Sequence, residues 1–264
     1  KFYPIQVGEK QICRLEATLR GPGGHGSIPV RGGAMSKLGK LLTTLDTRRL
    51  PVHITPVVET LVKAVAASLP APRNTGLLAL LDPSKTDAVL DGLGEFGRLL
   101  DPLLHNTVNA TMVEGGLAIN VIPSEIKLKL DGRLLPGITP DDILKEVHDL
   151  VGADIDLEVV RYDEYSTVAD MAVYDMLADI IREADPDGIP VPYILAGVTD
   201  GRHVAKLGIK NYGFTPLLLP DDPTLISTVH AADERVPVEA LDFGADCLYT
   251  LLQRYHKKAI QEGN

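Results

Sequence analysis

The sequence predicts a two-part α/β protein, and three observations lead to this fold class. The first part alternates apolar and polar residues in four short runs, which is the pattern of half-buried strands, with two amphipathic helical runs between them. The second part alternates helical patterns with short apolar runs, as α/β sheets do. The length of 264 residues exceeds one average domain and therefore agrees with two parts.

The first part has the element order strand, helix, strand, strand, helix, strand. In chain order the predicted elements lie at 11–19, about 33–46, 107–113, 125–134, 140–151 and 154–160. Thr139 is the expected N-cap of the second helix, and Pro140 occupies its first position. This is the split-βαβ order of a ferredoxin-like domain, with both helices on one face of the sheet. The free edge strand is then open to pairing with a partner.

A helical insertion at about 48–106 separates the first helix from the second strand. Pro56 suits a helix start, and an apolar stripe at helical spacing follows it. A further helix is expected at about 85–100. The domain boundaries that follow are 8–163 for the first part, insertion included, and 164–264 for the second.

The second part is expected to be an incomplete α/β sheet. Its predicted elements are a helix, then 192–195 (strand), 200–207 (helix), 209–214 (strand) and 237–257 (long helix). The first helix carries Met171, Tyr174, Leu177, Ile180 and Ile181. The residues of the long helix expected to face inward are Val238, Leu241, Ala245, Leu248, Leu252 and Tyr255. Because two strands do not make a stable doubly covered sheet, the remaining strands are expected from sequence outside this chain.

Composition argues against several partners. The formal net charge is −10 and no basic block occurs, which argues against nucleic acid. No run of about eighteen apolar residues exists, so no membrane span is predicted.

Cys13 and Cys247 lie in strand-like and helix-like runs and are expected to be buried thiols rather than a disulfide. The compartment stays open with the cytoplasm favoured; a signal-peptide pattern is missing, but the chain does not begin with methionine.

Two of the seven histidines stand where a site is plausible. His230 lies in a loop after an apolar run and precedes Asp233 and Glu234, and imidazole is a standard zinc ligand oriented by carboxylates. Spacing alone favours a capping or surface histidine at this position. His25 lies among glycines and prolines that leave its ring unshielded, although a tight turn with an incidental histidine fits equally. The histidines read as ordinary surface residues are His53, His105, His148 and His256.

Four polar residues are further candidates. Asn120 enters a strand and offers an amide to a carboxylate or carbonyl, or else caps a turn. Arg133 lies on the polar face of a strand and can grip a carboxylate with two N–H groups, or else is a solvated charge. Thr199 and Arg202 belong to the start of a short helix, where N–H groups attract anions, or where Thr199 simply caps the helix.

Together these segments resemble the di-zinc aminoacylase, carboxypeptidase and acetylornithine deacetylase family (clan MH amidohydrolases), in particular its carboxypeptidase S-like members with a long lid insertion. The resemblance rests on segments 24–27, 115–123, 131–137, 199–202 and 230–235, which occur in family order. Each segment is weak alone, whereas all five in that order are specific.

The resemblance implies a role for each candidate residue. His230 corresponds to the last zinc ligand, and His25 to a lid histidine that reaches into the partner protomer's site and polarises the scissile carbonyl. Asn120 and Arg133 correspond to substrate-holding groups on the lid, while Thr199 and Arg202 match a turn near the site. The resemblance also implies two zinc ions and a homodimer formed through the lid sheet.

The expected activity is metal-dependent hydrolysis of a peptide or an N-acyl-amino-acid amide bond. The family's other metal ligands and its general base come from an N-terminal segment that is absent here. Because His230 alone does not hold two zinc ions, this chain by itself is expected to be inactive. The alternative is a non-catalytic dimerisation or small-ligand-binding module.

Overall fold

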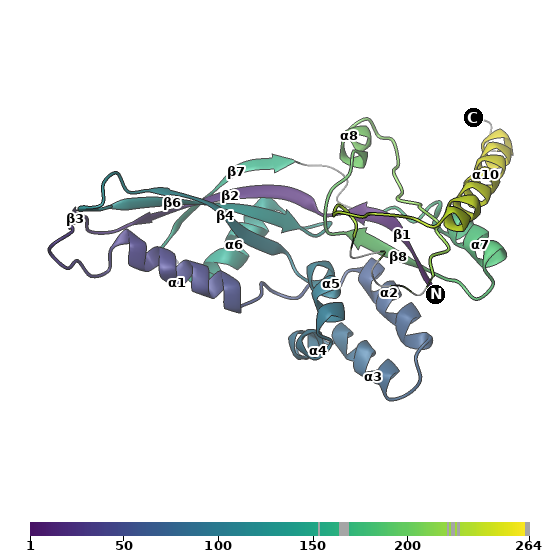
Figure 1. Cartoon of the computed structure of the whole chain (residues 1–264), viewed down its shortest axis with the longest axis horizontal. Coiled ribbons are helices and arrows are strands. Elements are labelled where there is room, and N and C mark those ends of the chain that lie inside the picture. The colour runs from purple at the N-terminus through teal and green to yellow at the C-terminus, as the bar shows by residue number, and fades with distance from the viewer. Residues whose placement is uncertain (153, 164–168, 221, 223–224, 226–227, 262–264) are drawn as a thin grey trace.

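The computed structural model of the chain describes residues 1–152, 154–163, 169–220, 222, 225 and 228–261. It is elongated, with a long four-stranded sheet at one end and a two-stranded sheet with its helices at the other (Figure 1). The predicted α/β class is confirmed. The boundary expected after residue 163 is followed by 164–168, which lie outside the described residues.

The four-stranded sheet is antiparallel and has the strand order β4-β6-β2-β7. Its strands are β2 (Gln11–Arg20), β4 (Thr107–Gly115), β6 (Glu125–Leu134) and β7 (Asp156–Asp163). Helices α1 (Ala34–Thr47) and α6 (Pro140–Val151) pack on one face. Element order and strand order together make this the predicted ferredoxin-like arrangement, with β4 and β7 at its edges.

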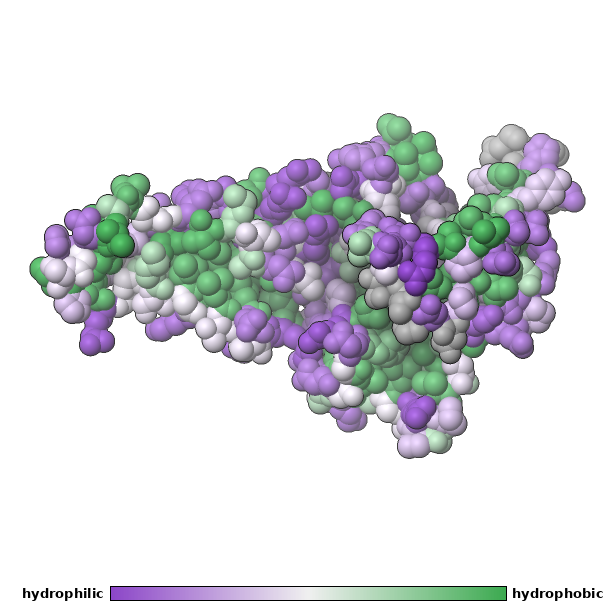
Figure 2. Space-filling view, viewed as in Figure 1, coloured by the Kyte–Doolittle hydropathy of each residue, from purple (hydrophilic) through white to green (hydrophobic). Residues whose placement is uncertain are grey.

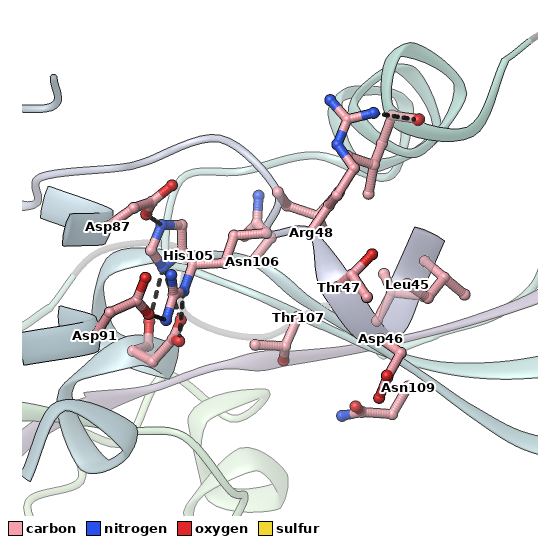
Figure 3. A pocket seen from close by; sticks show the side chains of 15 residues that line it. Leu45, Asp46, Thr47, Arg48, Asp87, Asp91, His105, Asn106, Thr107 and Asn109 are labelled. Atoms are coloured by element: carbon pink, nitrogen blue, oxygen red, sulfur yellow. Dashed lines mark hydrogen bonds and ion pairs between the residues drawn. The ribbon is translucent and has the colours of Figure 1, made fainter. Parts of the chain in front are cut away.

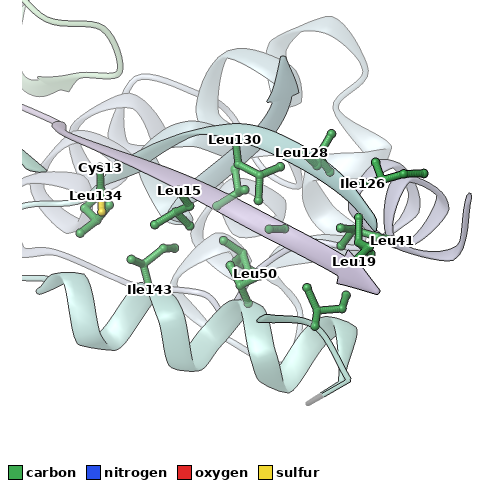
Figure 4. Packing of buried hydrophobic residues seen from close by; sticks show 14 of the residues in the cluster. Cys13, Leu15, Leu19, Leu41, Leu50, Ile126, Leu128, Leu130, Leu134 and Ile143 are labelled. Carbon is green, nitrogen blue, oxygen red and sulfur yellow. The ribbon is translucent and has the colours of Figure 1, made fainter. Parts of the chain in front are cut away.

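Alternation of side chains explains why β2 and β6 form the centre of this sheet. Cys13, Leu15, Ala17 and Leu19 of β2 are buried together with the apolar side chains of β6, against α1 and α6 (Figure 4). Each buried leucine or isoleucine among them contributes about 1.5–3 kcal/mol by leaving water. On the other face, Lys127 Nζ pairs with Glu16 Oε1 at 2.6 Å.

Local signals also fix the start of α6. Thr139 Oγ1 accepts a hydrogen bond from the Asp142 N–H (3.2 Å), and Asp142 Oδ2 accepts one from the Thr139 N–H (2.9 Å). This reciprocal capping box satisfies backbone donors that the helix itself leaves unpaired. The predicted N-cap and first-position proline are therefore confirmed.

The insertion is helical. Its helices are α2 (Pro56–Ala67), α3 (Arg73–Leu78), the short 3₁₀ helix η1 (Ala79–Leu81), α4 (Thr86–Gly92) and α5 (Glu95–Leu104). Pro56 begins α2 as predicted, with Thr55 as N-cap. The single helix expected at about 85–100 is wrong, because Gly94 adopts a positive φ of 57° that ends one helix before the next begins.

The second sheet pairs β1 (Phe2–Glu9) in parallel with β8 (Ile189–Leu195). Val191 packs in a cluster with Val58 of α2, whereas Ile194 packs with Leu177 of α7 (Tyr174–Ala184). Since side chains three positions apart on a strand point to opposite faces, this small sheet lies between α2 and α7. The insertion thus covers one face of the sheet in the C-terminal part.

Three expectations for the second part need correction. The remaining strands of the sheet were expected from sequence outside this chain, but one of them, β1, comes from residues 2–9 of this chain. The segment 209–214 is no strand; a single bridge joins Gly213 to Gln6 of β1. The apolar stripe of α10 (Val238–Gln261) does not face inward, because Val238, Leu241 and the rest of that stripe are exposed, while α10 buries Ala240 and Cys247.

The short helix expected at 200–207 is observed as α8 (Gly201–Ala205). Both cysteines, Cys13 and Cys247, are free and buried. Among the described residues, none of the helices has the length and apolar character needed to cross a membrane.

Candidate active-site loops

Two loops far apart in the sequence meet at the outer end of the long sheet. The two-residue strands β3 (Gly24–His25) and β5 (Val121–Ile122) form an antiparallel ribbon there (Figure 1). The Gly26 N–H donates to the Asn120 carbonyl oxygen at 2.8 Å. A Cβ at Gly23 would lie 2.9 Å from the Ile122 carbonyl oxygen, so the close approach of the two loops requires glycine. His25 and Asn120 are therefore neighbours in the fold.

The hydrogen bonds of His25 define which of its ring nitrogens carries a proton. The Ser27 backbone N–H donates to Nδ1 at 3.2 Å, and Ser27 Oγ lies 2.7 Å from the same nitrogen. A nitrogen that accepts a hydrogen bond is unprotonated, so the neutral ring carries its proton on Nε2. The side chain is exposed. It thus offers an N–H donor at the tip of the long sheet.

Arg133 lies near the other end of β6. At about 3.3 Å per residue, the strand puts roughly 26 Å between Glu125, beside the ribbon, and Arg133. The Arg133 guanidinium is bidentate on Asp131, with Nε–Oδ1 at 3.1 Å and Nη2–Oδ2 at 3.0 Å. Arg133 therefore stands apart from His25 and Asn120 within one chain, toward the second sheet.

The turn before α8 is tied to the end of β1. Both the backbone N–H and the hydroxyl of Thr199 donate to Glu9 Oε2, at 2.7 and 2.9 Å. The same hydroxyl oxygen accepts a hydrogen bond from the Gly201 N–H at 3.1 Å. Thr199 therefore also caps the start of α8, as the alternative interpretation of this residue predicted. Arg202 follows and lines a cavity of about 310 Å³ with Glu9. Thr199 and Arg202 are thus held beside the carboxyl end of a parallel strand, where α/β proteins commonly bind ligands.

His230 lies in the loop before α10 and has a left-handed backbone, with φ of 62°. Its backbone N–H donates to Glu234 Oε2 at 3.2 Å, and its side chain is exposed rather than packed in a core. Among the residues that the structure describes, no group of three or more His, Cys, Asp or Glu side chains is placed to hold a metal ion. A zinc site takes three or four protein ligands, so the described residues alone do not fit one.

The sequence interpretation missed a buried polar junction between the insertion and the long sheet. His105, read as a surface histidine, is only 1% exposed, so that reading is wrong. Its Nδ1 lies 2.9 Å from Asp101 Oδ1, and its Nε2 lies 3.1 Å from Asp87 Oδ1, out of line for a hydrogen bond. Although burial raises the pKa of Asp101, hydrogen bonds from His105 and Arg49 hold that pKa below its usual value.

The same junction continues toward α6. His53 Nε2 lies 2.6 Å from Glu146 Oε1, and Asn106 Nδ2 donates to Glu146 Oε2 at 2.9 Å. Lys10, which joins β1 to β2, is fully buried and donates to the His105 carbonyl oxygen at 2.8 Å. Asp101 and His105 at an (i, i+4) spacing were the available sequence signal.

A cavity of about 750 Å³ opens beside this junction (Figure 3). Its labelled lining residues come from the end of α1 and the residue after it, from α4, from the link between α5 and β4, and from the start of β4. None of the predicted site residues lines it. Arg49 pairs with Asp91 and Asp101, and His105 lies against Asp87 and Asp101. These contacts make the junction a structural link between the insertion and the sheet.

The ferredoxin-like sheet and its two loops lie within a segment that matches a peptidase dimerisation domain. The chain belongs to the M20 peptidase dimerisation family, whose domain matches residues 7–156. Over 96% of its length the chain is 27% identical to the N-fatty-acyl-amino acid synthase/hydrolase PM20D1 of Bos taurus, of which it covers 50%. It is 32% identical over 178 residues to a putative succinyl-diaminopimelate desuccinylase, DapE, of Mycobacterium tuberculosis, covering 65% of this chain and 45% of that protein.

Solved structures agree on the fold. The di-peptidase Dug1p of Saccharomyces cerevisiae superposes with a TM-score of 0.55 at 15% identity, over 97% of this chain and 57% of that one. The curated relatives carry the names of a fatty-acyl-amino acid synthase/hydrolase, a carboxypeptidase S-like protein and a desuccinylase, which agrees with the amide-hydrolysing family that the sequence resembles. The chain spans about half the length of the curated relatives it matches.

Proposed function

We propose that this chain is the lid and part of the catalytic domain of a metal-dependent hydrolase of N-acyl-amino-acid or peptide amide bonds. The observation that carries the proposal is the ribbon in which His25 and Asn120 lie side by side, with an exposed imidazole N–H at its tip. Residues 8–163 would be the lid and 164–264 the catalytic portion. Family membership and the amide-hydrolysing relatives support this function.

His25 would act as a hydrogen-bond donor to the oxyanion that forms when the amide carbonyl is attacked. An N–H group already oriented by Ser27 needs little reorganisation when charge develops, which is how such donors lower a barrier. Asn120 would hold the substrate beside it. Arg133, Thr199 and Arg202, at the other end of the sheet, would contact the substrate of a different active centre.

We further propose that the cofactor is zinc, as two ions, with His230 as one ligand. The other ligands would come from polypeptide beyond this chain. Two features support a missing packing partner: the exposed apolar stripe of α10, and the outer edge of β8, which has no strand beside it among the described strands. An exposed stripe of this kind commonly packs against another element.

The roughly 26 Å of β6 between its ribbon end and Arg133 keeps Arg133 apart from His25 and Asn120, which favours a homodimer through the lid sheet. On edge strand β4, Met112 and Val113 are both more than half exposed, so neither of these side chains is covered by a helix. Light scattering should give about twice the 28.4 kDa mass of one chain. Lysine at both positions should shift the mass toward that of the monomer, because charges oppose edge pairing.

The matched control for that experiment is Val160→Lys on the opposite edge strand, β7, where Val160 is about equally exposed. It should leave the mass unchanged. A monomeric wild-type chain at high concentration, or a mass that falls only with the β7 variant, contradicts the dimer proposed through β4.

The function is tested by comparing this chain with the full-length gene product. Zinc titration of the isolated chain should show at most weak binding, and hydrolysis of N-acyl amino acids should be undetectable. The full-length protein should bind zinc tightly and hydrolyse these substrates, and a chelator should abolish that activity. Turnover by the isolated chain, or a metal-free full-length protein with full activity, contradicts the proposal.

A further inference from the structure

We propose that the helical insertion is a brace that fixes the angle between the long sheet and the second sheet. This conformational role does not depend on the proposed hydrolase function. In the described part of the chain, one residue, Lys10, joins the two sheets directly, between the end of β1 and the start of β2. A link this short lets two domains swing about the rotatable bonds of a few residues, unless other contacts prevent it.

The apolar cores leave the two sheets separate. Among the described residues, the core of the long sheet has no member from β1 or β8. The cluster around Ile5, Val7 and Ile194 on the second sheet likewise has no member from the long sheet. On the face drawn in Figure 2, hydrophilic residues gather where the long sheet meets the rest of the molecule. Direct apolar packing between the sheets therefore does not set their angle.

Polar contacts clamp both ends of the insertion to the long sheet and its helix α6. The His53 N–H donates to the Leu104 carbonyl oxygen at 2.7 Å, which joins the two ends to each other. Glu146 of α6 binds both ends, because Oε1 lies 2.6 Å from His53 Nε2 and Oε2 accepts from Asn106 Nδ2 at 2.9 Å. Asn106 Oδ1 also accepts from the Leu135 N–H, just after β6, at 2.8 Å. Asn106 is buried, and hydrogen bonds shielded from water resist displacement.

The first insertion helix, α2, is anchored in the second sheet by apolar contacts. Val57 lies in one apolar cluster with Ile5 of β1 and Ile194 of β8. Val58, the next residue, lies in a cluster with Val191 of β8 and the other insertion helices. Figure 1 shows the insertion beneath the point where the two sheets meet, with α2 next to β8. The insertion therefore spans the link and holds the second sheet as well as the first.

Lys10 itself is bonded on both sides of the link. Its backbone N–H donates to the Leu195 carbonyl oxygen, at the end of β8, at 2.9 Å. Its buried Nζ donates to the His105 carbonyl oxygen, in the insertion, at 2.8 Å. A rotation of the long sheet about Lys10 would break these bonds, and it would also separate Glu146 from the insertion or slide α2 off β8. The contacts thus oppose any change of the angle.

A brace of this kind has a consequence for the proposed site. His25 lies at the far tip of the long sheet, whereas Thr199 and Arg202 lie beside the carboxyl end of β1 (Figure 1). With a fixed angle between the sheets, the separation of these groups within one chain stays constant. In the proposed dimer, His25 therefore approaches such residues only in the other protomer.

The test measures the angle as a distance in the full-length gene product. Spin labels at two exposed positions, Lys40 of α1 and Asp175 of α7, report this distance by pulsed electron paramagnetic resonance. They are introduced through non-natural amino acids, so that cysteines stay unlabelled. An excess of unlabelled protein ensures that most labelled dimers contain one labelled protomer. The wild-type protein should give a single narrow distance distribution.

Releasing the insertion from α6 should widen that distribution. Glu146→Ala removes the acceptor that binds His53 and Asn106, and the width should increase at least about twofold because the long sheet can then swing. Glu146→Gln keeps an oxygen for Asn106 and should widen the distribution less. The matched control is Asp149→Ala, because this exposed carboxylate of α6 pairs locally with Lys145. It should leave the width unchanged.

Val57→Ala loosens the other end of the brace without altering the buried polar junction, and it should also widen the distribution. This variant carries the test if Glu146→Ala does not fold. A broad distribution in the wild-type protein overturns the proposal. A narrow one that neither variant widens, while circular dichroism shows the variants to be folded, overturns it as well. Because the readout is a distance, failure of the proposed hydrolase function is detected separately, by the activity assays above.

Discussion

Replacing His25 by alanine in the full-length protein is expected to lower kcat by about 100- to 1000-fold, with KM much less affected. The size follows from removing one preorganised donor to a developing oxyanion. The ring projects from the tip of the sheet with Nδ1 occupied by Ser27, so its Nε2–H is the group that the substitution removes. Steady-state kinetics on an N-acyl amino acid measure the effect.

The control is His148→Ala, because the His148 ring bonds the Ile155 carbonyl oxygen at 3.2 Å and lies on α6, away from the ribbon. Activity should be retained in that variant. Ser27→Ala should lower kcat much less than His25→Ala does, because the backbone N–H of residue 27 still donates to Nδ1 of His25. A His25→Ala protein with wild-type kcat contradicts the assigned role.

A mixing experiment decides which protomer His25 serves. When His25→Ala and His230→Ala proteins are combined, random pairing should restore about a quarter of the wild-type activity, because half of the dimers then contain one intact composite site. The reason is that one protomer of the mixed dimer keeps His230 and receives His25 from its partner. If His25 acts within its own chain, mixing restores nothing.

Substituting Lys10 by methionine is expected to change how stability depends on pH. The Lys10 ammonium is buried at the link between β1 and β2, where Nζ donates to the His105 carbonyl oxygen and to Thr107 Oγ1. Burial lowers the pKa of Lys10 from 10.5 to about 7, while the nearby Asp101 carboxylate opposes this shift and Arg133 adds to it. The native protein therefore loses this proton at a lower pH than the unfolded chain.

Between pH 7 and pH 10.5 the unfolded chain binds more protons at this site than the native protein does. The free energy of unfolding therefore rises with pH across this window, by on the order of 4 kcal/mol from this group. Lys10→Met removes the titrating group. The free energy of unfolding of the wild-type protein should therefore increase relative to that of the variant as the pH rises. Urea denaturation of both proteins at pH 7 and pH 10 measures the difference.

Lys145→Met is the matched control, because Lys145 is exposed and pairs only locally with Asp149 on α6. It should follow the wild-type pH dependence. Other groups that titrate in the same range, such as buried cysteines and tyrosines, cancel in the comparison with Lys10→Met. If the free energy of unfolding changes by the same amount between pH 7 and pH 10 in the wild type and in Lys10→Met, the pKa of this lysine is not lowered.

Short-range patterns determined most of the elements. Three kinds of signal depend only on neighbours within a few positions: the alternation in β2 and β6, the cap at Thr139 and the proline at the start of α2. All of them are present in the structure. The ferredoxin-like strand order also followed, because few topologies satisfy that sequence of elements. His25 and Asn120 were recognised as site candidates separately, by residue type and resemblance.

Only the tertiary structure decided which of these groups meet and which faces are covered. Periodicity shows that α10 has an apolar stripe but not whether anything packs on it, and here Val238 and Leu241 remain exposed. In the same way, no local pattern shows that His105 is buried beside Lys10, or that His25 pairs with Val121. Burial and proximity come from contacts between distant segments, and these depend on how the chain folds back on itself.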